Sequence, residues 1–103
     1  MVKWPAQELE ALLALGGLTG SIDNLESASK LCEECPDMKL PPEVKRAFND
    51  EYEHFDQILP AIYNAIGKAY KEKCELDKAV SYFDKSMETI KKLREKYPKP
   101  KSD

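Results

Sequence analysis

Apolar side chains recur along most of this sequence at intervals of three and four residues, the spacing of one face of an α-helix. Prolines or glycines stand at most of the points where the pattern stops and restarts. No stretch shows a convincing alternation of apolar and polar residues, and glycine is scarce, which disfavours a β-sandwich. The sequence therefore predicts an all-α fold of four to five helices, over residues 5–15, 21–35, 42–70 and 75–97.

Pro60 interrupts the longest of these segments. A proline inside a helix removes one backbone donor, and its ring clashes with the carbonyl four residues earlier, at Asp56. Two arrangements remain open from the sequence. Either one helix is kinked near Asp56, or two helices meet around Gln57.

The length of 103 residues suits a single domain with a real but modest core. We assign residues 1–98 to one helical domain and residues 99–103 to a polar tail that follows the last helix. Trp4 precedes the first helix and is expected to pack against Leu9, although it could instead be exposed as an anchor for a partner.

The segment from residue 61 to about residue 92 has a specific spacing. The positions concerned are Tyr63, Ile66, Gly67, Tyr70, Ala79 and Phe83, followed by Ser86. They stand where a tetratricopeptide repeat (TPR) has its large apolar residue, Leu-Gly, Tyr, Ala, Phe and small residue, so the segment resembles one repeat of that family. The resemblance implies an antiparallel hairpin of two helices.

In such a hairpin Gly67 would let the helices approach closely with Ala79 opposite, and Tyr70 and Phe83 would fill the space between them. Two positions depart from the family pattern. Cys74 stands where the family usually has a glycine or a similar turn residue, and Lys91 replaces the closing proline, so that the second helix runs on. The resemblance covers about a third of the chain.

A degenerate earlier copy could occupy residues 6–35, but its separation from the clear copy exceeds the usual repeat length. Repeat hairpins bury their apolar faces on neighbours, and about three are normally needed for stability. This chain would therefore cap itself with residues 44–55, self-associate, or belong to a longer protein. Each alternative predicts an apolar face that awaits a partner.

The TPR resemblance also implies a function. The first helix of each TPR hairpin lines a binding groove, and the positions carried over here are Ala61, Asn64, Lys68 and Lys71. Their mixed polar and basic character suits a peptide that carries acidic residues. We expect a non-enzymatic adaptor or scaffold that binds a protein or peptide partner, with a self-associating helical bundle, a homo-oligomer, as the alternative.

A cysteine-based metal or redox protein is a third and weaker hypothesis. Cys32 and Cys35 have the two-residue spacing of such sites, but they lie at a helix C-terminus with two glutamates between them, where a thiolate is disfavoured. A zinc site would need further ligands, and only Cys74 and His54 remain. His54 has no recognisable nucleophile partner and is expected to be an exposed helical residue. We expect neither cofactor nor metal, with Cys32 in the core.

The charge distribution bears on partners and compartment. The net charge is −3, and acidic pairs such as Glu33-Glu34 oppose nucleic-acid binding, which depends on basic groups that neutralise phosphates. The basic residues near the C-terminus suit a helix end. No apolar run is long enough for a membrane span, and no secretion signal is evident, so a cytoplasmic or nuclear protein is expected.

Overall fold

Helices account for most of the chain that the computed structural model describes, which comprises residues 9, 22–48 and 51–97. They are α2 (Ile22–Glu34), α3 (Pro42–Phe48), the 3₁₀ turn η1 (Phe55–Ile58), α4 (Leu59–Glu72) and α5 (Leu76–Lys96). These residues form no strand, only an isolated β-bridge between Lys39 and His54. The predicted all-α fold is confirmed. The predictions for Trp4, for most of the first helix and for the tail lie outside the described residues.

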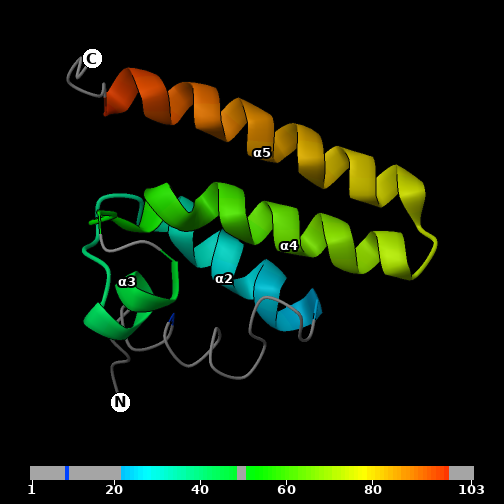
Figure 1. Ribbon diagram of the computed structural model, residues 1–103, viewed down its shortest axis with the longest axis horizontal. Helices are drawn as coiled ribbons and strands as arrows, with labels where there is room; N and C mark the ends of the chain where they lie inside the picture. The colour runs from blue at the N-terminus through cyan, green and yellow to red at the C-terminus, as the bar shows by residue number, and fades with distance from the viewer. Residues whose placement is uncertain (1–8, 10–21, 49–50, 98–103) are drawn as a thin grey trace.

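The helices are arranged around α4. Helix α5 runs antiparallel to α4 along one side, α2 packs on another side of α4, and the short α3 lies near the N-terminal end of α4 (Figure 1). Buried side chains from α2, α4 and η1 meet in one core, which Leu9 also joins. Its largest fully buried members are Phe55, Leu9, Leu25, Ile58, Ile62 and Ile66.

The chain around Pro60 forms two helices, not one kinked helix. Helix α3 ends at Phe48, and α4 begins at Leu59 with Pro60 in its first turn, where a proline needs no backbone donor. Residues 52–54 are not helical, so the expected helical pattern through Tyr52 is wrong. Backbone pairing replaces the helix there: Leu40 N–H donates to the Glu53 carbonyl (2.8 Å) and Phe55 N–H to the Met38 carbonyl (2.9 Å).

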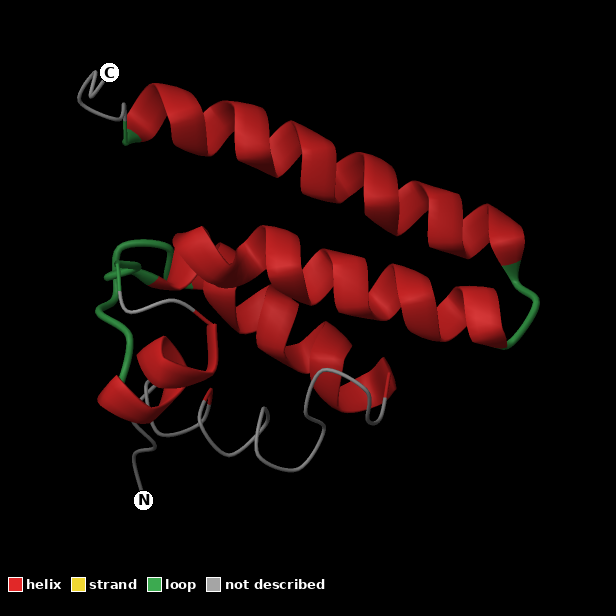
Figure 2. Ribbon diagram, viewed as in Figure 1, coloured by secondary structure: helices red, strands yellow, loops and turns green. Residues whose placement is uncertain are grey.

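A tight turn joins α4 to α5 (Figure 2). Glu75 N–H donates to the Tyr70 carbonyl (2.9 Å) and Cys74 N–H to the Lys71 carbonyl (3.0 Å), the two bonds of a Schellman motif. Cys74 has a φ of 64°, in the left-handed region where glycine is favoured. Cys74 therefore adopts a backbone conformation that favours glycine, the residue type that a TPR usually has at this position.

Replacing Cys74 by glycine is expected to stabilise the protein by about 1 kcal/mol, because glycine lacks the Cβ that makes the left-handed conformation unfavourable. Thermal unfolding followed by circular dichroism measures the change. Cys74→Val is the matched control, since a β-branched residue is strained at positive φ and should lower the melting temperature. A Cys74→Gly variant that melts at or below the wild-type temperature would contradict this account of the turn.

Gly67 of α4 lies directly against a side chain of α5. An added Cβ at this position would lie 2.7–2.9 Å from ring carbons of Phe83, which is closer than real side-chain contacts allow. The aromatic ring thus occupies the space that a side chain at Gly67 would need. The sequence placed Ala79 opposite this glycine, but the atoms that an added Cβ would meet first belong to Phe83. Ala79 itself is buried in the hairpin, with 2% of its surface exposed.

Candidate protein-interaction groove

An open groove runs between the first half of α4 and the second half of α5. Its volume is about 810 Å³. Its lining comprises Tyr52, Gln57, Pro60, Ala61, Asn64, Ile90, Leu93, Arg94 and Tyr97. Most of these side chains are apolar or aromatic, and no acidic residue is among them. The groove can therefore bury apolar side chains of a ligand while it offers amide, hydroxyl and guanidinium groups for hydrogen bonds.

A hydrogen bond between α5 and α4 holds the two sides of the groove together. Pro60 begins α4, and the Ser86 hydroxyl of α5 donates to the Pro60 carbonyl at 3.0 Å. Ser86 is almost fully buried, so this bond ties the middle of α5 to the first turn of α4. At the end of the groove, the Gln57 side-chain oxygen accepts from the N–H groups of Glu53 (2.6 Å) and His54 (2.9 Å).

Arg94 is the charged residue of the lining. It makes no ion pair with any side chain in the described part of the chain. Its side chain is exposed, and so is that of Asn64 across the groove. A guanidinium group in this state can bind a carboxylate through two parallel hydrogen bonds. The electrostatics of the groove thus favour an acidic group on a ligand.

The structure brings two of the four predicted groove residues into this lining, Ala61 and Asn64. Lys68 and Lys71 follow Asn64 at intervals of four and three residues, so they continue the same face of α4 toward the turn. Both are exposed and lie outside the groove lining. Sequence reasoning did not identify the α5 side, although the spacing of Ile90, Leu93 and Tyr97 in the extended helix could have indicated it.

Three of the hairpin residues predicted from the sequence, Tyr63, Ile66 and Tyr70, lie on one face of α4. Ile66 is fully buried in the core, while Tyr63 and Tyr70 reach carboxylates of α2. The Tyr63 hydroxyl donates to Glu33, and that of Tyr70 to Glu26 at 2.8 Å. Bonding to Glu26 raises the pKa of Tyr70, because the carboxylate favours the protonated hydroxyl.

Tyr82 of α5 completes this cluster. Its hydroxyl also donates to Glu26, at 3.0 Å, and its ring stacks on that of Tyr70 with centroids 5.8 Å apart. Burial, with this hydrogen bond, raises the pKa of Tyr82 to about 12. Lys85 lies over the Tyr82 ring at 5.0 Å. Both helices of the hairpin are thereby held to α2, which leaves the groove side uncovered by α2.

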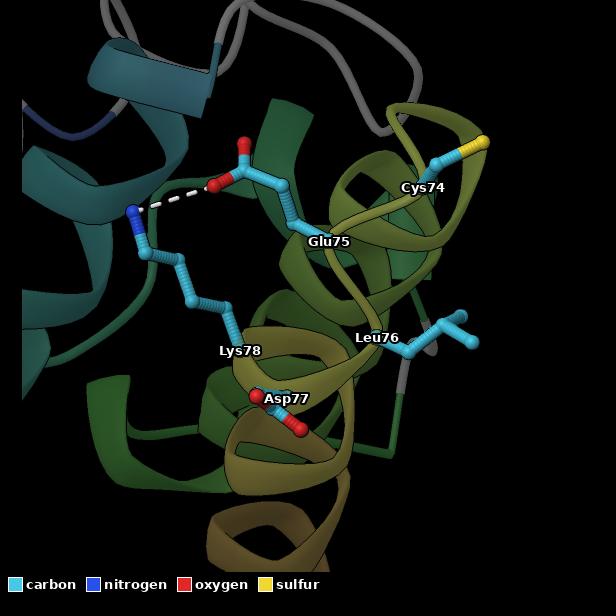
Figure 3. A pocket seen from close by; sticks show the side chains of 5 residues that line it. All are labelled: Cys74, Glu75, Leu76, Asp77 and Lys78. Carbon is cyan, nitrogen blue, oxygen red and sulfur yellow. Dashed lines mark ion pairs between the residues drawn. The ribbon is translucent and has the colours of Figure 1, made fainter.

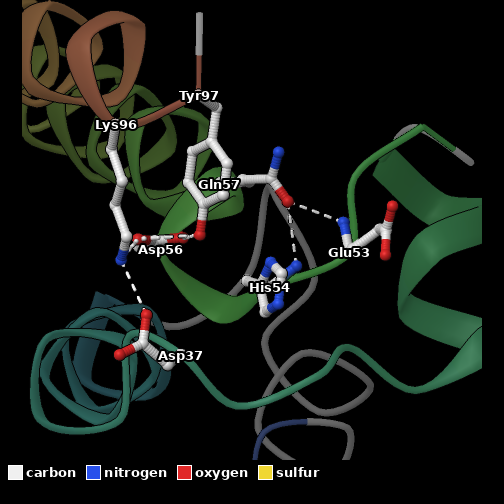
Figure 4. A network of polar contacts seen from close by, with 7 residues as sticks. All are labelled: Asp37, Glu53, His54, Asp56, Gln57, Lys96 and Tyr97. Atoms are coloured by element: carbon white, nitrogen blue, oxygen red, sulfur yellow. Dashed lines mark hydrogen bonds and ion pairs between the residues drawn. The ribbon is translucent and has the colours of Figure 1, made fainter.

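A polar network holds the last turn of α5 (Figure 4). The Lys96 ammonium donates to Asp37 and to Asp56, each at 2.7 Å, and the Tyr97 hydroxyl lies 3.3 Å from Asp56. Asp56 is 6% exposed, so these partners offset the cost of burying its charge. Since Tyr97 also lines the groove, the network fixes one groove wall.

His54 belongs to the same region. Its ring stacks on Tyr97 with centroids 5.7 Å apart, and its buried Nδ1 atom has no hydrogen-bond partner among the described residues. The expectation of an exposed helical histidine is wrong, because residue 54 pairs with Lys39 in the β-bridge and is half-buried.

Because Asp37 forms an ion pair with Lys96, we expect the stability of the protein to depend on pH in the acidic range. The hydrogen bond from Lys96 lowers the pKa of the Asp37 carboxyl below its ordinary value of 3.8. Because the pKa of Asp37 is lower in the folded state than in the unfolded chain, the ionised carboxylate stabilises the fold at pH values above 3.8. This stabilisation is lost as the pH falls through the lowered pKa of the folded state. We expect the melting temperature of Asp37→Asn to fall less than that of the wild type between about pH 5 and pH 2.

The matched control for this experiment is Asp84→Asn on α5, since Asp84 is exposed and makes no ion pair within the described ranges. Its melting profile against pH should follow that of the wild type. Identical profiles for Asp37→Asn and the wild type would mean that the Lys96–Asp37 pair makes no contribution in solution.

The cysteines are three free thiols. Cys32 is fully buried, and burial together with the nearby Asp56 and Glu33 carboxylates raises its pKa to about 12. A raised pKa disfavours the thiolate that redox chemistry or metal binding requires. Cys35 is half-buried and Cys74 exposed. The described residues contain no group of three or more side chains placed to hold a metal ion.

Comparison with known proteins gave no match to a protein family, to a curated protein or to a solved structure. Within residues 22–48 and 51–97, none of the helices combines the length and apolar character that crossing a bilayer requires.

Proposed function

We propose that this chain is a non-enzymatic protein-interaction module, an adaptor or scaffold, that binds a peptide segment of a partner in the groove between α4 and α5. One observation carries the proposal. An open groove with a largely apolar lining includes an arginine that has no ion-pair partner in the described ranges. Apolar lining and an available guanidinium are the two elements by which short peptide segments with acidic residues are recognised.

The ligand that suits this arrangement has a large apolar residue and a nearby acidic one. The apolar residue would pack against Ile90, Leu93 and Pro60, and the acidic residue would pair with Arg94, with Asn64 as a hydrogen-bond donor across the groove. The resemblance of residues 61–92 to a TPR supports the same reading, since that family binds peptides on the first helix of each hairpin. Three free thiols are compatible with a reducing compartment, the cytosol or nucleus.

A peptide-display selection against the full chain, followed by titration of the selected peptides, tests this proposal. We expect selected sequences to combine an aromatic or aliphatic residue with an acid. Arg94→Glu should weaken their binding by about 10- to 30-fold, and Asn64→Ala by a smaller factor, because one loses a charge-assisted contact and the other a neutral one. Amide shifts in NMR spectra should map the bound peptide to the groove.

Two further variants serve as comparisons. Lys30→Glu reverses a positive charge, as Arg94→Glu does, but on the exposed surface of α2 and away from the groove. It should leave peptide binding unchanged. Lys68→Glu tests whether the site extends along α4 as the sequence predicted. If Arg94→Glu and Asn64→Ala both bind the peptides with unchanged affinity, the groove is not the peptide-binding site.

A further inference from the structure

Helix α5 carries an apolar stripe that the rest of the described chain leaves largely uncovered. Leu76, Val80 and Met87 expose 59%, 56% and 62% of their surfaces, and the half-buried Phe83 lies between them. The intervals of four, three and four residues continue to Ile90, which is the heptad spacing of a helix that packs against another helix. Apart from Met38, these three are the exposed large apolar side chains of the described residues.

The three exposed members of this stripe, Leu76, Val80 and Met87, lie off the face that α5 buries on α4, while Phe83 reaches Gly67 at the boundary between the two. Ala79 and Ser86 mark the buried face, and both are almost inaccessible. At the start of α5, Leu76 points the opposite way from the Glu75–Lys78 ion pair, beside a hollow of about 410 Å³ (Figure 3). Apolar residues gathered on one exposed helix face in this way indicate a contact surface for another protein.

The charges along α5 indicate what covers the stripe. Asp77, Asp84 and Lys91 follow one edge of it at seven-residue intervals. At this edge Asp77 lies in the first turn of the helix, Asp84 near its middle and Lys91 toward its C-terminal end. A second α5 laid antiparallel along the stripe would place each Asp77 near Lys91 of the other copy, twice in one dimer, and would bring like charges together once, at Asp84 near the axis. A parallel arrangement would bring like ends together instead, which is unfavourable.

We infer that the stripe of α5 is a self-association surface, on which a second copy of this chain packs its own α5 in the antiparallel direction. A two-fold axis near Phe83 would bring Leu76 of one copy toward Ile90 of the other and Val80 toward Met87. The interface is isologous, so the same stripe serves both copies and the assembly closes at a dimer. This inference is independent of the peptide groove, although the two surfaces meet at Ile90.

Sedimentation equilibrium of the full chain tests the inference. The wild type should form a reversible dimer at about 200 µM or below, and its melting temperature should rise with protein concentration. Met87→Glu places a charge in the centre of the interface and should raise the dissociation constant by about 100-fold. Because Met87 is mainly exposed in the monomer, this variant should keep its circular dichroism spectrum and fold. Ser81→Glu, on an exposed position away from the stripe, should dimerise as the wild type does.

A charge exchange tests the direction of packing. Asp77→Lys and Lys91→Glu should each weaken the dimer by several fold, about three- to tenfold, because each creates two like-charge contacts. The double variant Asp77→Lys/Lys91→Glu should regain wild-type affinity, since it restores both pairs with their signs reversed. A monomer at about 200 µM would overturn the inference and leave the stripe to a helix of another protein. A dimer that Met87→Glu does not weaken would also overturn it.

Discussion

Replacing Phe55 by alanine is expected to lower the free energy of unfolding by about 3–5 kcal/mol, the largest effect of any single substitution considered for this protein. Phe55 lies in η1 and is fully buried, among the largest such side chains of the core. Truncation removes its apolar surface from the core and leaves a cavity that the surrounding residues fill only in part. Urea denaturation followed by circular dichroism measures the loss.

The matched control for Phe55→Ala is Phe83→Ala, the same truncation at a half-buried position on α5. The resemblance to a TPR places Phe83 in the space between the hairpin helices, and its partial exposure in the structure predicts a smaller loss than for Phe55, about 1–2 kcal/mol. Equal losses in the two variants, or a larger one in Phe83→Ala, would mean that η1 is not part of the main core. The experiment therefore also tests the non-helical path of the chain before α4.

Replacing Gly67 by leucine is expected to destabilise the protein by about 1–3 kcal/mol, the second large effect. The first atom of any side chain at this position would lie within 3 Å of the Phe83 ring, so α4 and α5 must separate or the ring must turn out into solvent. Leucine is a better helix former than glycine, which offsets up to about 1 kcal/mol of the loss. Denaturation by urea again gives the free energy.

A double-mutant cycle isolates the contact between Gly67 and Phe83. In a Phe83→Ala background the ring is absent, and Gly67→Leu should cost less than in the wild type, with a coupling of about 1 kcal/mol or more. Additive effects would place the strain elsewhere and would contradict the packing of α5 across Gly67. Such a result would also weaken the proposed adaptor role, because the groove depends on the fixed relation of these two helices.

The helical content of the chain was predictable from residue spacing, because apolar periodicity reports directly on the buried face of a helix. The bounds of α5 and the turn at Cys74 follow from this signal, as does the burial of Cys32. The path between α3 and α4 was not predictable in the same way. Tyr52 and Phe55 fit a helical spacing, yet the backbone there pairs with residues 38–40, and such distant pairing leaves no local pattern in the sequence.

The α4 side of the candidate groove could be predicted from the sequence, and the α5 side could not. Position within a repeat-like hairpin identified Ala61 and Asn64, since the exposed face of α4 follows from its buried one. The places of Arg94 and Tyr97 in the groove lining depend on how far α5 extends beside α4 and on where η1 brings Gln57, which are tertiary contacts. The two acceptors of the tyrosine hydroxyls, Glu26 and Glu33, went unnoticed for the same reason, because residues more than 25 positions apart carry no shared spacing.

The attachment of Lys96 to two carboxylates has a consequence for motion. The final turn of a helix usually frays, and its amide hydrogens exchange rapidly with solvent. Here that turn is joined to Asp37 beyond α2 and to Asp56 in η1, which are 59 and 40 residues away in the chain. Its opening should require the loosening of distant parts of the molecule, so amide protons near residue 96 should exchange as slowly as those of the helix interior.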